Sequence, residues 1–159
     1  MPRKLSHISA TGRAVMVNVG DKPVTERVAT AECFVRISPA LAKAIRANTL
    51  KKGDLLSVAR LAGIQAAKRT DELIPLCHSL PLDSVEVEAK LIKNQVHITA
   101  TARTHAKTGV EMEALTAAAI AALTVIDMGK AIDKSMTIDG LRILEKRGGR
   151  SGHYKAPKS

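Results

Sequence analysis

DSVEVEAKLIKNQVHITATAR, residues 83–103, contains two segments in which apolar and polar residues alternate. Alternation with a period of two predicts half-buried strands, and the short Lys93-Asn94 turn between the segments predicts a β-hairpin. Similar alternation predicts three further strands: a short one in GRAVMVNVG (12–20), a longer one over residues 25–37, and a closing one in MTIDGLRILEK (136–146) that is interrupted by Gly140.

Three other segments have helical features. In SPALAKAIRAN (38–48), Ser38 is placed to cap a helix and Pro39 falls in its first turn. Asp54 is a candidate N-cap for a second helix, in which apolar residues follow at spacings of three and four. The third segment, GVEMEALTAAAIAALTVIDMGKAID (109–133), predicts a long alanine-rich helix.

The order of these elements from residue 25 is strand, helices, strand, strand, helix, strand. This order predicts an α+β fold of the ferredoxin-like split β-α-β type, with an antiparallel sheet and helices packed on one face. We expect a single catalytic domain over residues 13–147 between two flexible tails, 1–12 and a glycine-rich basic segment at 148–159. The many alanines of the long helix predict a close helix contact or a subunit interface.

The composition restricts the class of partner. Lys and Arg number 25 against 15 acidic residues, a formal net charge of +10, which attracts anions. Phe34 and Tyr154 are the only aromatic residues apart from histidine, so base stacking on single-stranded nucleic acid is disfavoured. No apolar run approaches the roughly 20 residues that span a bilayer. We therefore expect a small polyphosphate ligand with no nucleic-acid and no membrane partner, although a generally basic surface would give the same charge.

The long helix carries two sets of ionisable residues. Asp127 and Lys130 are three positions apart on one face, which suits either a general acid–base pair or an ordinary surface ion pair. Glu111 and Glu113 fall in the first turn, where acids also complement the helix dipole. Glu113 and Asp127 are 14 residues apart, so roughly 21 Å at 1.5 Å per residue. If both ends serve one small ligand, the active site must lie between two chains.

LIPLCHSLPL (73–82) places Cys77 and His78 in an otherwise apolar loop. A zinc site needs further ligands at regular spacing, and the other histidines are scattered, so we expect no metal site. Adjacent residues of an extended loop point in opposite directions, which disfavours a Cys–His nucleophile pair. A proline-stiffened ligand-binding turn remains. With only Cys33 as a second cysteine, both thiols are expected to be free, as in a reducing cytoplasm.

Three tracts, KGDLLSVARLAGIQAAKRTDELIPLCH (52–78), TGVEMEALTAAAIAALTVIDMGKA (108–131) and KRGGRSG (146–152), resemble the molybdenum cofactor biosynthesis protein C family, the cyclic pyranopterin monophosphate synthases. The resemblance implies a ferredoxin-like α+β subunit in a hexamer made of three dimers, with active sites at a dimer interface. It also implies a lyase that rearranges a 3′,8-cyclo-dihydro-GTP into cyclic pyranopterin monophosphate and releases pyrophosphate. No cofactor is implied, although the triphosphate could bring a divalent cation such as Mg.

The same resemblance implies roles for individual residues. Asp127 matches the family's active-site acid, and Lys130 and Lys52 match its catalytic lysines. Eight positions match substrate-binding residues: Leu76, Cys77, His78, Met112, Glu113, Glu111, Arg27 and Lys146. Two positions depart from the family pattern, since Ser79 follows His78 in place of proline and Ile126 stands in place of a tyrosine before Asp127.

Two other functions fit the element order. RNA-recognition modules share it, but their strands carry aromatic residues, and residues 83–104 carry none. A non-catalytic assembly protein could be built around the alanine-rich helix, and it would have no affinity for guanine nucleotides or pterins.

Overall fold

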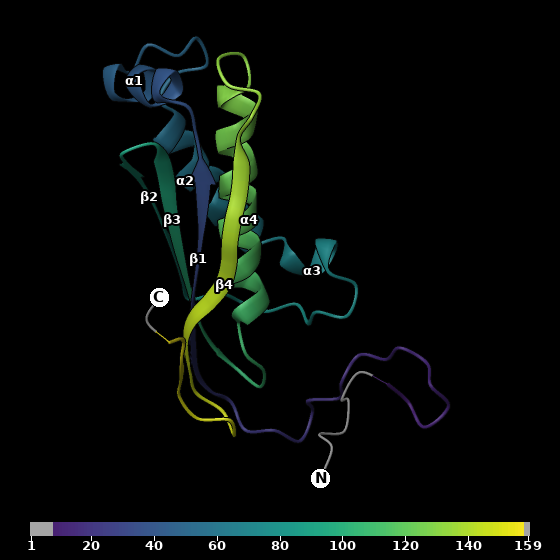
Figure 1. The fold of residues 1–159 in the computed structure, drawn as a ribbon. Helices are drawn as coiled ribbons and strands as arrows, with labels where there is room; N and C mark the ends of the chain where they lie inside the picture. Colours follow the sequence, from purple (N-terminus) through teal and green to yellow (C-terminus); the bar gives the residue numbers. More distant parts are fainter. Residues whose placement is uncertain (1–7, 158–159) are drawn as a thin grey trace.

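The computed structural model describes residues 8–157 (Figure 1). Most of the predicted N-terminal tail, residues 1–7, therefore lies outside the described residues. The elements in chain order are β1 (Thr25–Arg36), α1 (Pro39–Ala47), α2 (Leu55–Ala67), α3 (Thr70–Leu73), β2 (Ser84–Ile92), β3 (Gln95–Ala106), α4 (Glu111–Gly129), β4 (Thr137–Arg147) and β5 (Tyr154–Lys155).

The strands form one antiparallel sheet in the order β2-β3-β1-β4-β5. The helices α2 and α4 pack together on one face of it (Figure 1). Strands β1 to β4 thus have the arrangement expected from the split β-α-β order, and the predicted α+β fold is confirmed.

The predicted hairpin is confirmed, because β2 pairs with β3 from Ser84 opposite Arg103 to Ile92 opposite Gln95. Lys93 has φ 53° in the turn, the left-handed conformation that tight hairpin turns require. Alternate residues of the central strands, such as Ala31 and Ile98, are fully buried under the helices. The period-two pattern therefore marks the core face of the sheet correctly.

Two of the helix starts follow the predicted caps. The Ser38 hydroxyl accepts a hydrogen bond from the Leu41 amide, and the Asp54 carboxylate accepts one from the Ser57 amide at 3.0 Å. The long helix is shorter than the predicted 109–133, since it ends at Gly129 with Lys130 as C-cap. The chain then turns, because the buried Asp133 carboxylate accepts hydrogen bonds from the Ser38 and Ser135 amides.

The predicted strand in residues 12–20 is wrong. In this segment the structure has only an isolated bridge between Ile8 and Ala14, and the chain is otherwise irregular up to β1. Alternation predicts which side chains share a face, but a strand also needs a hydrogen-bonding neighbour, and this segment pairs with no strand of the described chain. The sequence also gave no indication of α3 or of β5, which lies within the predicted C-terminal tail and pairs with β4.

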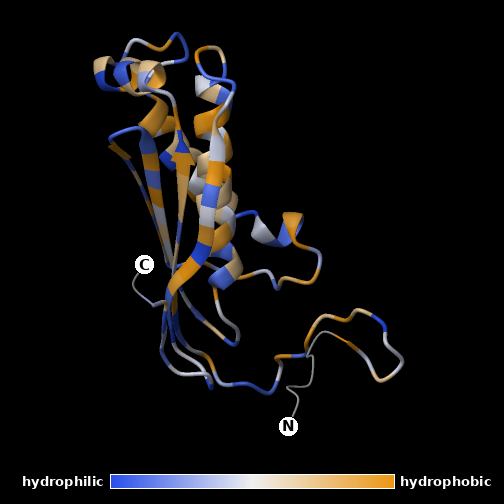
Figure 2. Cartoon of the chain, viewed as in Figure 1, coloured by the Kyte–Doolittle hydropathy of each residue, from blue (hydrophilic) through white to orange (hydrophobic). Residues whose placement is uncertain are grey.

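The closing strand β4 runs through Gly140 without a break, since this glycine adopts φ 64° inside an irregular part of the β1–β4 pairing. Figure 2 shows that hydrophobic residues make up much of α4. Within the described residues, α4 has the length and composition of a membrane span, but half of it is buried inside the domain against the sheet and α2. Its packing is that of a core helix.

Small residues allow α2 and α4 to approach closely. Ala59 of α2 and Ala114, Ala117 and Ala121 of α4 are fully buried. A Cβ atom added at Gly63 would lie 2.9 Å from the Ala117 carbonyl oxygen and 3.2 Å from the Val87 methyl groups. The alanine-rich sequence of α4 is therefore explained by packing inside one subunit.

We expect Gly63→Ala to destabilise the fold. Alanine favours a helix over glycine by about 1 kcal/mol, but here its methyl group would push α2 away from a backbone carbonyl that cannot yield locally. The expected net loss is about 1–2 kcal/mol in the free energy of urea unfolding. Gln65→Ala, an exposed position of the same helix, is the control and should change this free energy by less than about 0.5 kcal/mol. An unchanged stability of Gly63→Ala would contradict the close contact.

Candidate active site

The predicted catalytic residues meet at the carboxyl end of α4. The Lys52 ammonium donates to Asp127 Oδ2 at 2.8 Å and to the Asp127 main-chain carbonyl at 3.2 Å. The Lys130 ammonium donates to Asp127 Oδ1 at 2.7 Å. The three side chains border a cavity of about 420 Å³ whose floor is largely apolar, lined also by Thr49, Leu50, Lys51, Met128, Ala131 and Ile132.

The Asp127 carboxylate forms ion pairs with two ammonium groups, those of Lys52 and Lys130. The hydrogen bond from Lys130 and then that from Lys52 lower the pKa of Asp127 to about 2. Asp127 is therefore ionised at neutral pH and cannot donate a proton. Its chemistry here is to position two lysine amines, which supply the cationic and proton-bearing groups of this cluster.

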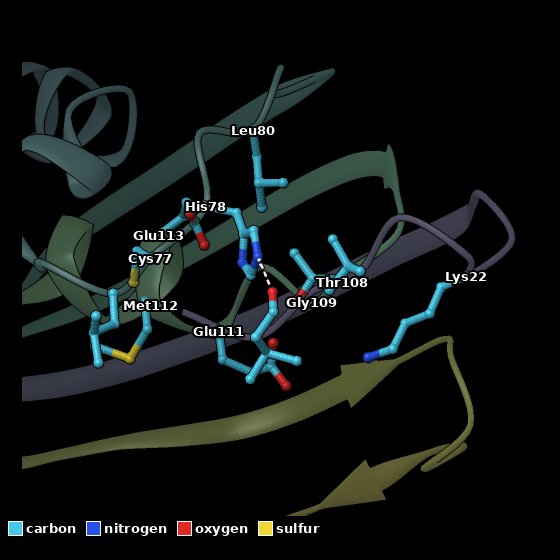
Figure 3. Close-up of a pocket in the computed structure, with 12 residues that line it drawn as sticks. Lys22, Cys77, His78, Leu80, Thr108, Gly109, Glu111, Met112 and Glu113 are labelled. Atoms are coloured by element: carbon cyan, nitrogen blue, oxygen red, sulfur yellow. Dashed lines mark hydrogen bonds between the residues drawn. The ribbon is translucent and has the colours of Figure 1, made fainter. Parts of the chain in front are cut away.

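The other predicted residues gather at the amino end of α4, around a cavity of about 310 Å³ (Figure 3). One wall is the start of α4 and another is the loop between α3 and β2. Six of the predicted substrate-binding residues line it: Leu76, Cys77, His78, Glu111, Met112 and Glu113.

Glu113 is the buried acid of this cavity, with only 4% of its surface exposed. Burial, and to a lesser extent the charges of Glu111 and Asp71, raise its pKa to about 7. Near neutral pH this carboxyl group therefore exists in both protonation states. Burial and the nearby Glu113 and Asp71 also raise the pKa of the Cys77 thiol. Cys77 is thus a neutral thiol, which agrees with a ligand-binding turn rather than a thiolate nucleophile.

Arg27 and Lys146 lie next to this cavity, in a small hollow that also includes Glu111 and Gly148. Lys146 donates to Glu111 at 2.7 Å. The Arg27 Nε atom is buried, and within residues 8–157 it has no hydrogen-bond partner. The Arg27 Nη2 atom of the same guanidinium donates to the Lys107 carbonyl oxygen at 3.5 Å.

The glycines of KRGGRSG have a structural role that the sequence did not show. A Cβ atom at Gly149 would lie 1.9 Å from the Arg27 guanidinium, and one at Gly148 would lie 2.1 Å from the Glu26 carbonyl oxygen. Both glycines have positive φ. They let the chain after β4 pass directly over Arg27, so the tract packs against this cation.

The two clusters stay apart within one chain. Glu113 and Asp127 occupy opposite ends of the single uninterrupted helix α4, so their backbones are separated by roughly 21 Å. The structure therefore brings together three predicted residues at one end and eight at or beside the other, but not the two groups. Among the described residues, no group of three or more His, Cys, Asp or Glu side chains could hold a metal ion.

The predictions missed several residues that line the cavity at the amino end. They are Val17, Val19, Lys22, Leu80, Thr108 and Gly109. Lys22 adds a cation to a lining that also contains the acids Glu111 and Glu113. Thr108 and Gly109 directly precede the acidic first turn of α4, so their position could have been expected. For Val17, Val19 and Lys22, which precede β1, nothing in the sequence indicated a position beside this cavity.

The family model of the MoaC family matches residues 16–149, most of the chain and every residue of the two clusters. The chain belongs to the MoaC family. The resemblance carried by the three sequence tracts is thus confirmed. MoaC proteins are enzymes of molybdenum cofactor biosynthesis, and this chain has a role in that process.

Proposed function

We propose that this MoaC protein is a cyclic pyranopterin monophosphate synthase. It rearranges (8S)-3′,8-cyclo-7,8-dihydroguanosine 5′-triphosphate into cyclic pyranopterin monophosphate and releases pyrophosphate, as a phosphorus–oxygen lyase. It acts as a cytoplasmic homohexamer made of three dimers, without a resident cofactor, and a divalent cation such as Mg can enter with the triphosphate. Two free cysteines, Cys33 and Cys77, support a reducing compartment.

One observation carries this proposal: each end of α4 holds an incomplete site. The Lys52–Asp127–Lys130 cluster has two lysine side chains paired with one exposed carboxylate, but it has no buried acid. The other end has the buried Glu113 and a His–Cys loop. A two-fold axis that sets two α4 helices antiparallel would place the carboxyl end of one beside the amino end of the other, and it would create two equal composite sites.

The chemistry of the rearrangement suits such a composite site. To form the cyclic phosphate, a hydroxyl oxygen of the sugar attacks the α-phosphorus, its proton passes to a base, and the bond to pyrophosphate breaks. Two lysines beside one aspartate leave a net positive charge, which stabilises the departing pyrophosphate. We assign Lys130, which the ionised Asp127 holds in place, to proton transfer, and Lys52 to acid–base work or to the triphosphate.

Opening and reclosing the purine-derived ring requires protons to be delivered and removed in turn. Glu113, with a pKa of about 7, is suited to both steps near neutral pH. His78 and the loop that carries it face the same cavity and would contact the ring. Arg27 and Lys146, beside Glu111, would contact its phosphates.

The test is conversion of the cyclo-dihydro-GTP by the purified protein. We expect cyclic pyranopterin monophosphate, identified by mass spectrometry, and pyrophosphate, measured by a coupled assay, in equal amounts. GTP is the control substrate and should give neither product, because it lacks the C3′–C8 bond. Tight binding of the substrate with no pyrophosphate release would contradict the proposed reaction.

A further inference from the structure

The segment before β1 forms part of the cavity that holds His78. We call residues 17–22 the strap. Val17, Val19 and Lys22 are half-buried and line the cavity, whereas Asn18 and Gly20 are exposed. Figure 3 shows the side chains of Lys22 and His78 at this cavity, and its dashed line marks the hydrogen bond of the His78 ring. The strap is therefore a wall of the site.

Two hydrogen bonds hold the strap against the domain, and a third closes a turn within it. The His78 ring donates from Nε2 to the Val17 carbonyl oxygen at 2.7 Å. The Lys107 ammonium, just after β3, donates to the Gly20 carbonyl oxygen at 2.5 Å. Between these two points the Asn18 side chain accepts a hydrogen bond from the Gly20 amide at 2.8 Å, which closes a local turn. The turn sets the direction of the carbonyls that meet His78 and Lys107.

The contact with Val17 determines which ring nitrogen of His78 carries the proton. A carbonyl oxygen can only accept, so Nε2 must be protonated when this hydrogen bond forms. In the neutral ring Nδ1 is then the acceptor. Among the described elements, the charged or titratable side chains lining the same cavity are Lys22, Cys77, Glu111 and Glu113.

We infer that the strap positions His78 for ligand binding: the Val17 carbonyl fixes the ring so that Nδ1 accepts a hydrogen bond from an N–H or O–H group of the ligand. Asn18 and Lys107 are positioning residues, since they act on His78 through the strap. The identity of the ligand, a reduced guanine or pterin ring with a sugar phosphate, rests on the proposed function. The inference that the Val17 carbonyl fixes the orientation of the His78 ring does not rest on the proposed function.

The first experiment measures how fast His78 reacts with diethyl pyrocarbonate in the intact protein, by peptide mass spectrometry. Asn18→Leu removes the acceptor of the local turn at similar volume, whereas Asn18→Asp keeps one. We expect carbethoxylation of His78 to be about fivefold faster in Asn18→Leu, the factor that corresponds to one lost hydrogen bond, and unchanged in Asn18→Asp. His105 and His153 serve as controls in the same digest, because both are exposed and distant in sequence from the strap.

Lys107→Gln shortens the side chain that donates to the Gly20 carbonyl oxygen, and it provides a second variant if Asn18→Leu does not fold. It should also speed the reaction of His78 with diethyl pyrocarbonate. Equal rates of His78 modification in wild type and in the folded variants would overturn the inference. This result does not depend on any catalytic activity, so it is separate from failure of the proposed function.

The second experiment compares steady-state kinetics on the cyclo-dihydro-GTP. A binding role for His78 predicts that Asn18→Leu raises KM about fivefold with a smaller change in kcat, and that Asn18→Asp restores KM. Faster modification of His78 with an unchanged KM would show that the strap restrains the ring but does not position it for the ligand, and this too would overturn the inference.

Discussion

Replacement of Lys130 by alanine should lower the turnover of the cyclo-dihydro-GTP by about 10²- to 10⁴-fold, the usual contribution of a positioned acid or base. Lys130 contacts Asp127 Oδ1 at 2.7 Å and borders the cavity at the carboxyl end of α4. Because the side chain is exposed, its loss should leave the fold intact. Lys134→Ala, an exposed lysine outside this cavity, is the control and should keep wild-type kcat.

Lys130→Arg separates the two roles that a lysine can have. Arginine keeps the positive charge and the hydrogen bond to Asp127 but stays protonated at any working pH. If Lys130 transfers protons, Lys130→Arg should remain nearly as slow as Lys130→Ala in a single-turnover assay. If it only binds phosphate, much of the rate should return. A Lys130→Ala enzyme that works within twofold of wild type would show that the role assigned to Lys130 is wrong.

Glu113→Gln should make the protein more stable and less active. We expect turnover to fall by about 10²-fold or more, since glutamine cannot exchange a proton. We also expect the free energy of unfolding at pH 8 to rise by up to about 3 kcal/mol, because the folded wild type buries a charged carboxylate there and the variant does not. Single-turnover kinetics and urea unfolding of the same samples measure the two effects.

The pH dependence of the stability difference follows from the raised pKa. The Glu113 pKa is 4.5 when unperturbed and about 7 in the fold, so between these values the folded state holds a proton that the unfolded state releases. Wild-type stability therefore falls as pH rises through this window, and the gain in Glu113→Gln should be nearly absent at pH 4.5 and complete at pH 8. Glu72→Gln, at an exposed site, is the control. A gain for Glu113→Gln that does not vary with pH would contradict burial of the charge as its cause.

The parts of the fold that could be predicted are those set by local patterns. The hairpin, the caps at Ser38 and Asp54 and the helix α4 each have a periodic signal or a capping residue in the sequence. The alternation of Val15, Val17 and Val19 gave a wrong strand, because alternation does not say whether a neighbouring strand exists. In the structure this segment is irregular, and Val17 and Val19 face a cavity.

The site was predictable in part for the same reason. The contact between Asp127 and Lys130 follows from their spacing on a helix, and the structure confirms that they meet. Lys52 is 75 positions from Asp127, so only the family resemblance pointed to it. No local pattern could have shown that Gly149 packs on Arg27, since that contact depends on the path of the chain after β4.

The central claim is that each active site combines the carboxyl end of one α4 with the amino end of its neighbour. The most direct test mixes two inactive variants, Lys130→Ala and Glu113→Gln, by partial unfolding and joint refolding of equal amounts. In a mixed dimer one site carries both substitutions and the other carries neither. With random pairing, half of the dimers are mixed, so about a quarter of wild-type activity should return. A mixture that stays as inactive as its components, while mass spectrometry shows that subunits have exchanged, would contradict the shared site.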